Sequence, residues 1–279
     1  MENPADILAQ ATLKRERLLQ QLASVPVSEV VGVVEAMGTG GGRSRGEELW
    51  TLRTKFEAWR VHGGALETRP LRISGKVTDA DLKKLQALLP AYAIVRIHAR
   101  VINESPFGGP EALFERVLGF DDSDAELNQF AANLQKPVTF DDPMFGTFTL
   151  DRRIKWFIGK AAWKGGEIKI NLEGKETSAV RAALKTAQAL WQSQTEWDQR
   201  VRDYAVMRLL ERKNDDWLGE GEDEVSSDQF KARMKLESVT TRPDGEFDFW
   251  FDDGNLFWGH AIQISGNLST GPTHVDTPG

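Results

Sequence analysis

One short segment near the end of the chain restricts the fold more than any other. Residues 245–265 read GEFDFWFDDGNLFWGHAIQIS, in which apolar and polar residues alternate on both sides of Asp253-Gly254. Such alternation is typical of β-strands, because successive side chains point to opposite faces of a sheet. An Asp-Gly pair between two strands is a strong signal for a two-residue type I′ turn. The segment therefore predicts a β-hairpin.

Counting outward from this turn assigns each side chain to one face of the hairpin. Phe251 is expected to pair with Leu256, and Phe249 with Trp258. A face with this much apolar surface is expected to pack against another layer of the protein. Its predicted members are Phe247, Phe249, Phe251, Leu256, Trp258, His260, Ile262 and Ile264.

The opposite face of the predicted hairpin is smaller and more polar. There Trp250 is expected to face Phe257, with Asp248 and Asp252 beside the two rings. Aromatic side chains with a polar rim are typical of protein–protein interfaces. This face is a candidate partner-binding site, and a helix packed over the two rings would produce the same sequence pattern.

The rest of the chain predicts two α+β halves with antiparallel sheets. Residues 1–137 combine helical stripes with alternating segments such as 50–61, which predicts a strand. A helix is expected to have Pro110 in its first turn. The segment LQKPVTFDDP marks the joint, so we predict one α+β domain over residues 1–137 and a second over residues 138–279.

Residues 138–279 predict a β-meander, then a helical pair, then the C-terminal hairpin. The meander is expected to turn at Gly165-Gly166, which pairs Trp163 with Ile168. A helical pattern over residues 178–213 is too long for one helix of a small domain, so it predicts two helices.

Charge is distributed unevenly along the chain, which has a net charge of −7. Residues 1–137 hold 17 basic and 18 acidic residues, whereas residues 138–279 hold 18 basic and 24 acidic ones. The acidic second half disfavours nucleic acid, whose phosphates need positive charge, and favours a basic protein partner. The acidic run that includes Glu222, Asp223 and Glu224 is a candidate docking loop for that partner.

Several catalytic and cofactor classes lack the residues they need. The chain has no cysteine, which excludes disulfides, thiolate metal sites and cysteine nucleophiles. Its four histidines show no metal-ligand spacing, and we predict neither a metal nor a cofactor. Residues 42–46 match the pattern G-x-S-x-G, but a glycine-rich loop precedes them where a nucleophile elbow requires a strand.

The sequence also contains no pattern for a membrane or for export. No apolar stretch is long enough to span a bilayer, and the first residues lack the basic start and apolar run of a signal peptide. We therefore expect a cytoplasmic protein without a membrane partner.

Four segments together resemble a known protein family. They are LQKPVTFDDPMFGTFTLDRRIKWF, WDQRVRDYAV, FKARMKLESV and DGEFDFWFDDGNLFWGHAIQISGNL. In this order they are similar to an uncharacterised bacterial family, the domain of unknown function twenty-two sixty-two. The resemblance implies a bacterial cytoplasmic protein and assigns no activity or site residue.

Taken together, the residues favour a non-enzymatic binding protein that acts through a protein partner. An immunity protein, which neutralises a basic toxin, is a specific version of this prediction. The alternative is a hydrolase that pairs a carboxylate with His260 in a cleft between the two halves. In the predicted register, however, His260 lies on the opposite sheet face from Asp248 and Asp252.

Overall fold

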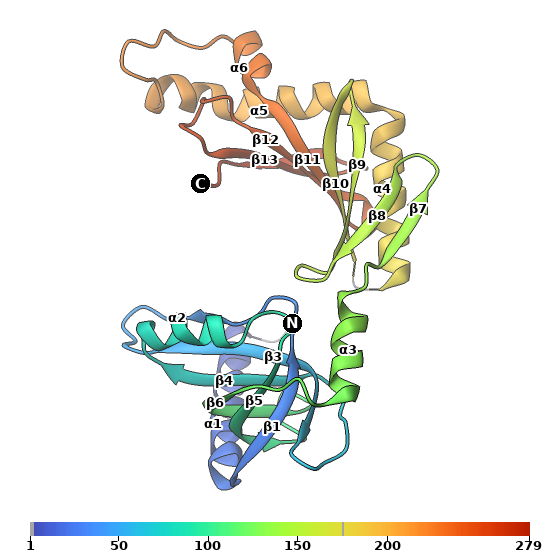
Figure 1. The fold of residues 1–279 in the computed structure, drawn as a ribbon. Coiled ribbons are helices and arrows are strands. Elements are labelled where there is room, and N and C mark those ends of the chain that lie inside the picture. Colours follow the sequence, from blue (N-terminus) through green and yellow to red (C-terminus); the bar gives the residue numbers. More distant parts are fainter. Residues whose placement is uncertain (1–2, 175) are drawn as a thin grey trace. The chain divides into compact units, whose positions relative to one another are not determined.

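The chain divides into two compact units. The structure, a computed structural model, describes residues 3–174 and 176–279. The two units are Met1–Lys136 and Pro137–Gly279. Each unit combines helices with a mainly antiparallel sheet, which confirms the predicted α+β class (Figure 1).

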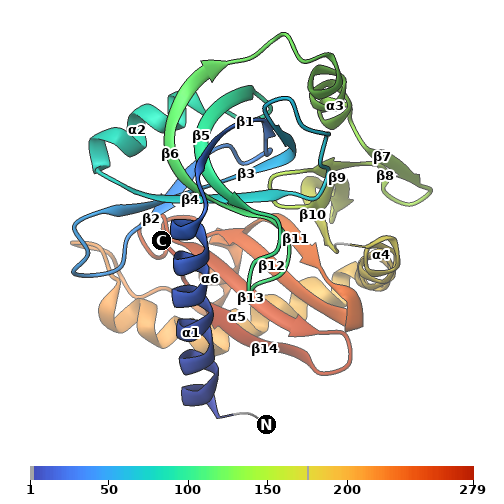
Figure 2. The same cartoon turned by 90° about the horizontal axis from the view of Figure 1, so that it is seen from below.

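The described part of the first unit contains three helices and six strands. In chain order they are α1 (Pro4–Ser24), β1 (Val27–Val34), β2 (Gly40–Gly42), β3 (Trp50–Val61), β4 (Leu71–Val77), α2 (Asp79–Leu88), β5 (Ile94–Ile102), β6 (Glu111–Phe120) and α3 (Ala125–Gln135). Figure 2 shows the long strands of this unit curving around one another.

Five of these strands close into a barrel. Strand β1 pairs with both β3 and β5, and the order around the barrel is β1, β3, β4, β6, β5. Only β4 and β6 run parallel, and α2 connects β4 to β5. A five-stranded barrel with this connectivity is an OB-fold. The short strand β2 pairs with β3 alone.

The barrel forms because β3 has the period-two pattern predicted from its sequence. Leu52 and Phe56 are fully buried while Arg53 between them is exposed. After a register shift in this strand, the fully buried Ala58 packs with Leu127 of α3. Thr78 caps the N-terminus of helix α2, since its side chain accepts a hydrogen bond from the Asp81 N–H at 3.1 Å.

The helix predicted at Pro110 is wrong. Residues Glu111–Phe120 form strand β6, which pairs with β4 on one side and β5 on the other. The segment EALFERVLGF is rich in helix-favouring residues, but its place between two strands of the barrel outweighs that weak local preference.

The described part of the second unit contains three α-helices, one short 3₁₀ helix and eight strands. They are β7 (Thr139–Asp142), β8 (Gly146–Asp151), β9 (Trp156–Trp163), β10 (Gly166–Glu173), α4 (Thr177–Gln192), α5 (Gln194–Asp216), α6 (Ser227–Arg233), β11 (Lys235–Thr241), η1 (Pro243–Gly245), β12 (Glu246–Asp252), β13 (Ala261–Asn267) and β14 (Gly271–Asp276).

The eight strands lie in one sheet in their sequence order, β7 to β14. Neighbouring strands are antiparallel except β10 and β11, and the three α-helices form the crossover between these two. The sheet buries Phe249, Phe251 and Ile264 in the same core as Leu190 of α4 and Val201 of α5. The helices therefore cover the apolar face that the sequence predicts for the hairpin.

The register of the C-terminal hairpin differs from the predicted one. Phe251 pairs with Ile262 and Phe249 with Ile264, so residues 253–260 form an eight-residue loop instead of a two-residue turn. Both loop lengths are even, and the paired side chains therefore keep their predicted faces. Residues Leu256 to His260, which were predicted to pair with the first strand, lie in the loop instead.

The meander hairpin is displaced in a similar way. Trp163 pairs with Gly166, so the two-residue turn is Lys164-Gly165 rather than Gly165-Gly166. Both turn residues have positive φ angles, 47° and 86°, as a type I′ turn requires. The Lys164 N–H donates a hydrogen bond to the Gln194 side chain at 3.0 Å, which helps to hold this lysine in the turn.

Among the described residues, no helix combines the length and the apolar character needed to cross a membrane.

We expect the barrel of the first unit to be sensitive to a single methyl group at Gly32. A Cβ atom there would overlap the ring of Phe56 and lie 2.9 Å from the carbonyl oxygen of Ala58. Gly32→Ala should lower the free energy of unfolding by about 1–3 kcal/mol, because overpacking forces the surrounding chain to move. Urea unfolding measures the change. Gly42→Ala is the control, since a Cβ at Gly42 meets no atom within 4 Å, and an equal loss in both variants would contradict the packing argument.

Candidate functional site

The loop between β12 and β13 is organised by one buried carboxylate. Asp253 is only 2% exposed. Its two oxygens accept hydrogen bonds from the backbone N–H groups of Asn255 at 3.0 Å, Phe257 at 2.6 Å and Gly259 at 3.2 Å. Hydrogen bonds to an ionised acceptor are among the strongest in proteins. This carboxylate therefore fixes the path of the whole loop.

The same loop holds its backbone in an unfavourable conformation. Gly254, Asn255, Trp258 and Gly259 all have positive φ angles, and that of Trp258 is 56°. A positive φ is uncommon for a bulky residue, and strain of this kind costs on the order of 1–3 kcal/mol per residue. The strained Trp258 side chain is nevertheless 61% exposed. Burial of its ring therefore does not account for the strain.

Trp217, which caps the C-terminus of α5, supports the loop from one side. Its ring centroid lies 4.8 Å from that of Trp258, 5.6 Å from that of Phe257 and 5.4 Å from that of His260. The Arg212 guanidinium lies over the Trp217 ring at 5.7 Å. Trp217 thus joins the exposed indole to the fully buried Phe257 and to the core behind it.

An ion network joins this loop to the acidic segment after α5. The Glu222 carboxylate accepts hydrogen bonds from Lys213 at 2.7 Å and from Arg233 at 2.8 Å. Arg233 also donates to the carbonyl oxygens of Gly254 at 3.0 Å and Asn255 at 2.7 Å. Lys213 is completely buried and donates a second bond to the Trp217 carbonyl oxygen.

This network changes the role expected for the acidic run. The Gly219 N–H, followed by Lys213 and Arg233, lowers the pKa of Glu222 to about 2. Glu222 is therefore an internal support of the loop, with 29% of its side chain still exposed. Asp223 and Glu224, the other two predicted docking residues, are exposed. We use the term Trp258 surface for four residues: the exposed Trp258, the half-buried Trp217 that packs against it, and the exposed Asp223 and Glu224 of the segment that the Glu222–Arg233 network joins to the loop.

The predicted pairing of Trp250 with Phe257 is wrong. Trp250 lies opposite Gln263 and Ser238, and Phe257 is fully buried against Trp217. The two predicted acidic neighbours also differ in role. Asp248 is buried in an ion pair of 2.6 Å with Arg242, whereas Asp252 is exposed and accepts from the Gly254 N–H. The eight-residue loop, which removes Phe257 from the strand ladder, is the reason.

His260, the residue of the hydrolase alternative, is half-buried at the end of the loop. Its ring packs edge-on against Trp217, and its Nδ1 lies 3.3 Å from the carbonyl oxygen of Thr277. Among the described residues, no carboxylate lies within hydrogen-bonding distance of the ring. The geometry therefore gives this histidine a packing partner and no catalytic one.

Sequence reasoning missed Trp217 and Trp258 as a pair. They lie 41 positions apart in the sequence, and each taken alone resembles one of the many core tryptophans. One sequence feature could have drawn attention to Trp217: it follows the end of a long helical pattern and immediately precedes the acidic run. Nothing in the sequence shows that Trp258 has a positive φ or points outward.

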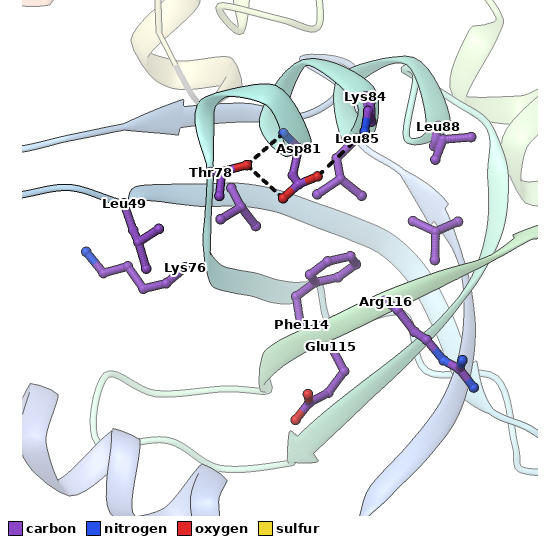
Figure 3. Close-up of a pocket in the computed structure, with 12 residues that line it drawn as sticks. Leu49, Lys76, Thr78, Asp81, Lys84, Leu85, Leu88, Phe114, Glu115 and Arg116 are labelled. Carbon is purple, nitrogen blue, oxygen red and sulfur yellow. Dashed lines mark hydrogen bonds and ion pairs between the residues drawn. The ribbon is translucent and has the colours of Figure 1, made fainter.

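A hollow of about 460 Å³ lies in the first unit between α2 and strands β4 and β6 (Figure 3). Leu85, Leu88 and Phe114 supply apolar surface in it. Two of its charged groups already have partners, since Lys76 pairs with Glu47 and Glu115 with Arg100. Within the described sequence, no group of three or more histidine or acidic side chains could hold a metal ion. We find no catalytic arrangement in this hollow.

Family comparisons cover both units and assign no activity. Residues 142–276 match the family described as "Uncharacterized protein conserved in bacteria (DUF2262)". This confirms the resemblance found in the sequence. Residues 14–134 match "Domain of unknown function (DUF7021)". No curated protein matches the chain.

A search of solved structures finds a weak likeness. A chain from "Structure and Conformational Change of a Replication Protein A Heterotrimer Bound to ssDNA" aligns with a TM-score of 0.27 and 10% identity. The alignment covers 53% of this chain and 39% of that chain. A likeness this weak transfers neither fold nor ligand, so the OB-fold assignment rests on the strand pairing alone.

We expect the support beneath the Trp258 surface to depend on pH through Glu222. Its folded pKa is about 2, below the ordinary value of 4.5. Stability from this carboxylate is therefore fully present above pH 4.5 and is lost as the pH falls from 4.5 towards 2. At pH 7, Glu222→Gln should lower the free energy of unfolding by about 3 kcal/mol, because the buried Lys213 loses its counter-ion.

Urea unfolding of both proteins between pH 7 and pH 2.5 measures this effect. The difference between wild type and Glu222→Gln should shrink as the pH falls below 4.5. Glu237→Gln, at an exposed position outside the network, is the control. A difference that stays constant over this range would show that the network does not act through the carboxylate charge.

Proposed function

We propose that the protein is a non-enzymatic binding protein that captures a protein partner on the Trp258 surface. The observation that carries this proposal is the exposed Trp258 side chain, which a strained loop presents and a buried carboxylate fixes. Exposed tryptophans on rigid supports are typical energetic centres of protein interfaces. A preorganised side chain also loses less conformational entropy on binding.

The exposed carboxylates of the Trp258 surface support a basic partner. Asp223 and Glu224 are exposed, and the second half of the chain carries more acidic than basic residues. A partner's arginine or lysine side chain could lie over the exposed indole ring while these carboxylates attract it. A protein that neutralises a basic toxin by binding, as an immunity protein does, is the specific version of this proposal.

The proposal places the protein in the bacterial cytoplasm. The absence of cysteine from the sequence fits a reducing compartment and gives no sign of a secreted disulfide framework. The matching family is described as conserved in bacteria.

We expect Trp258→Ala to abolish partner capture without unfolding the protein. Loss of a central interface tryptophan weakens binding by at least about 2 kcal/mol, or roughly thirtyfold. Affinity capture of the tagged chain from lysate of its own host, followed by quantitative mass spectrometry, measures partner recovery. Met207→Ala is the matched control, since Met207 is an exposed apolar residue on α5 outside the site.

A second pair of variants tests the charge of the site. The double variant Asp223→Lys and Glu224→Lys should reduce capture and make it less sensitive to added salt, because the attraction that salt screens is removed, whereas Glu237→Lys should change neither. Glu222 is kept unchanged because its replacement would disturb the loop itself. Equal recovery from wild type and Trp258→Ala would overturn the proposal.

A further inference from the structure

A groove of about 500 Å³ lies on the barrel of the first unit and shares no lining residue with the hollow of Figure 3. Strand β2 forms one wall, and the outward side chains of β3 and β4 form the floor. In the sheet ladder, Gly40 lies opposite Arg53, and Arg53 lies opposite Ser74. Lys55 lies opposite Arg72 in the next row.

Two glycines of β2 have no explanation within the unit. Gly41 is required, because a Cβ there would lie 2.6 Å from the Leu82 side chain of α2. A Cβ at Gly40 or Gly42 meets no atom within 4 Å, and neither residue has a positive φ. Glycine in a strand costs about 0.5–1 kcal/mol relative to alanine. Packing inside the unit therefore does not require glycine at these two positions. Glycine within a strand often indicates a site where another backbone approaches closely.

The outer edge of β2 is also unpaired. Strand β2 pairs with β3 on one side, and no described residue donates to or accepts from its backbone on the other side. Proteins usually protect such an edge with charged side chains, proline or a covering element. The three glycines of β2 give this short edge no side-chain protection, so its free N–H and C=O groups are open to an added strand.

The charge of the groove is positive, but most of it is balanced internally. Lys55 pairs with Glu35 at 3.1 Å and with Glu57 at 2.9 Å. Arg72 pairs with Glu111 at 2.8 Å. Arg53 is exposed and, among the described residues, makes no ion pair. One free guanidinium matches a single carboxylate, whereas a polyphosphate chain would need several free cations.

We propose that the β2 edge binds an extended acidic segment of a partner protein as an added strand. The backbone of the segment pairs with the free edge of Gly40–Gly42. A carboxylate of the segment reaches Arg53 across Gly40, which has no side chain to obstruct it. Addition of a peptide strand to an open sheet edge is a general mode of recognition, in which side-chain contacts supply specificity.

Single-stranded nucleic acid is the competing occupant, and the groove suits it less well. Glu35 and Glu111 both line the groove and would repel phosphates. None of the residues that line it is aromatic, so the bases would have no ring to stack on.

Amide NMR of the isotope-labelled full chain tests the proposal. The probe is a blocked synthetic octapeptide of alternating valine and aspartate. Its addition should shift the backbone signals of Gly40, Gly41, Gly42 and Arg53. Arg53→Ala should weaken the fitted affinity by about fivefold to tenfold, as expected for an exposed charge-assisted hydrogen bond. The Trp258→Ala protein should bind the probe normally, which separates this site from the proposed function.

A second variant obstructs the path across position 40 to Arg53 without removing any contact inside the unit. Gly40→Val should preserve or raise the melting temperature, because valine favours strands and its Cβ has free space. It should also weaken binding of the peptide at least as much as Arg53→Ala does. The corresponding valine–lysine peptide and an oligothymidylate of equal length are the comparison ligands.

Each of four results would overturn the proposal. They are an absence of shifts in strand β2, unchanged binding in both variants, equal binding of the lysine peptide, and tighter binding of the oligothymidylate at the same residues. The last result would assign the groove to nucleic acid.

Discussion

The Lys213 side chain is completely buried, and the site of the second unit depends on the groups that compensate its positive charge. A buried charge is tolerated only when it is paired and hydrogen-bonded. Glu222 supplies the opposite charge, and Arg233 binds the other side of the same carboxylate. Because Arg233 also reaches the loop between β12 and β13, a single ion network positions two loops that are distant in the sequence. The exposed surface of the site depends on this internal support.

The loop that presents Trp258 has a strained backbone that hydrogen bonds and aromatic packing hold in place. Asp253 accepts three backbone hydrogen bonds, and Trp217 packs against the exposed indole. These interactions offset the unfavourable backbone of Asn255 and Trp258. A loop without such support would relax, and the tryptophan would collapse onto the sheet to bury its ring. The arrangement therefore favours a fixed, outward-facing aromatic residue.

The two units carry surfaces with different chemistry. The Trp258 surface offers an exposed aromatic ring and two exposed carboxylates, whereas the barrel offers a glycine-lined strand edge and an exposed arginine. Among the described residues, neither surface contains a group of three or more histidine or acidic side chains that could hold a metal ion. The fold alone does not identify a function, since barrels and α+β sheets support many activities. The binding proposals therefore rest on individual side chains and their surroundings.

Hydrophobic periodicity in the sequence was sufficient to predict most of the architecture. The alternating Phe247, Phe249 and Phe251 predicted a buried sheet face, and that face is buried. The side chains of Thr78 and Ser226 cap the helices that follow them directly. These features depend on near neighbours in the chain, so the sequence determines them.

The tertiary structure decided what the sequence could not. The helix-like segment from Glu111 became a strand because two barrel strands pair with it. Asp253-Gly254 opened into a long loop because Asp253 binds three backbone N–H groups there, while Arg233 holds the Gly254 and Asn255 carbonyls. The composition and period of the chain thus determined which faces are apolar. Long-range hydrogen bonds and ion pairs, which link residues far apart in the sequence, determined the register and left Trp258 exposed.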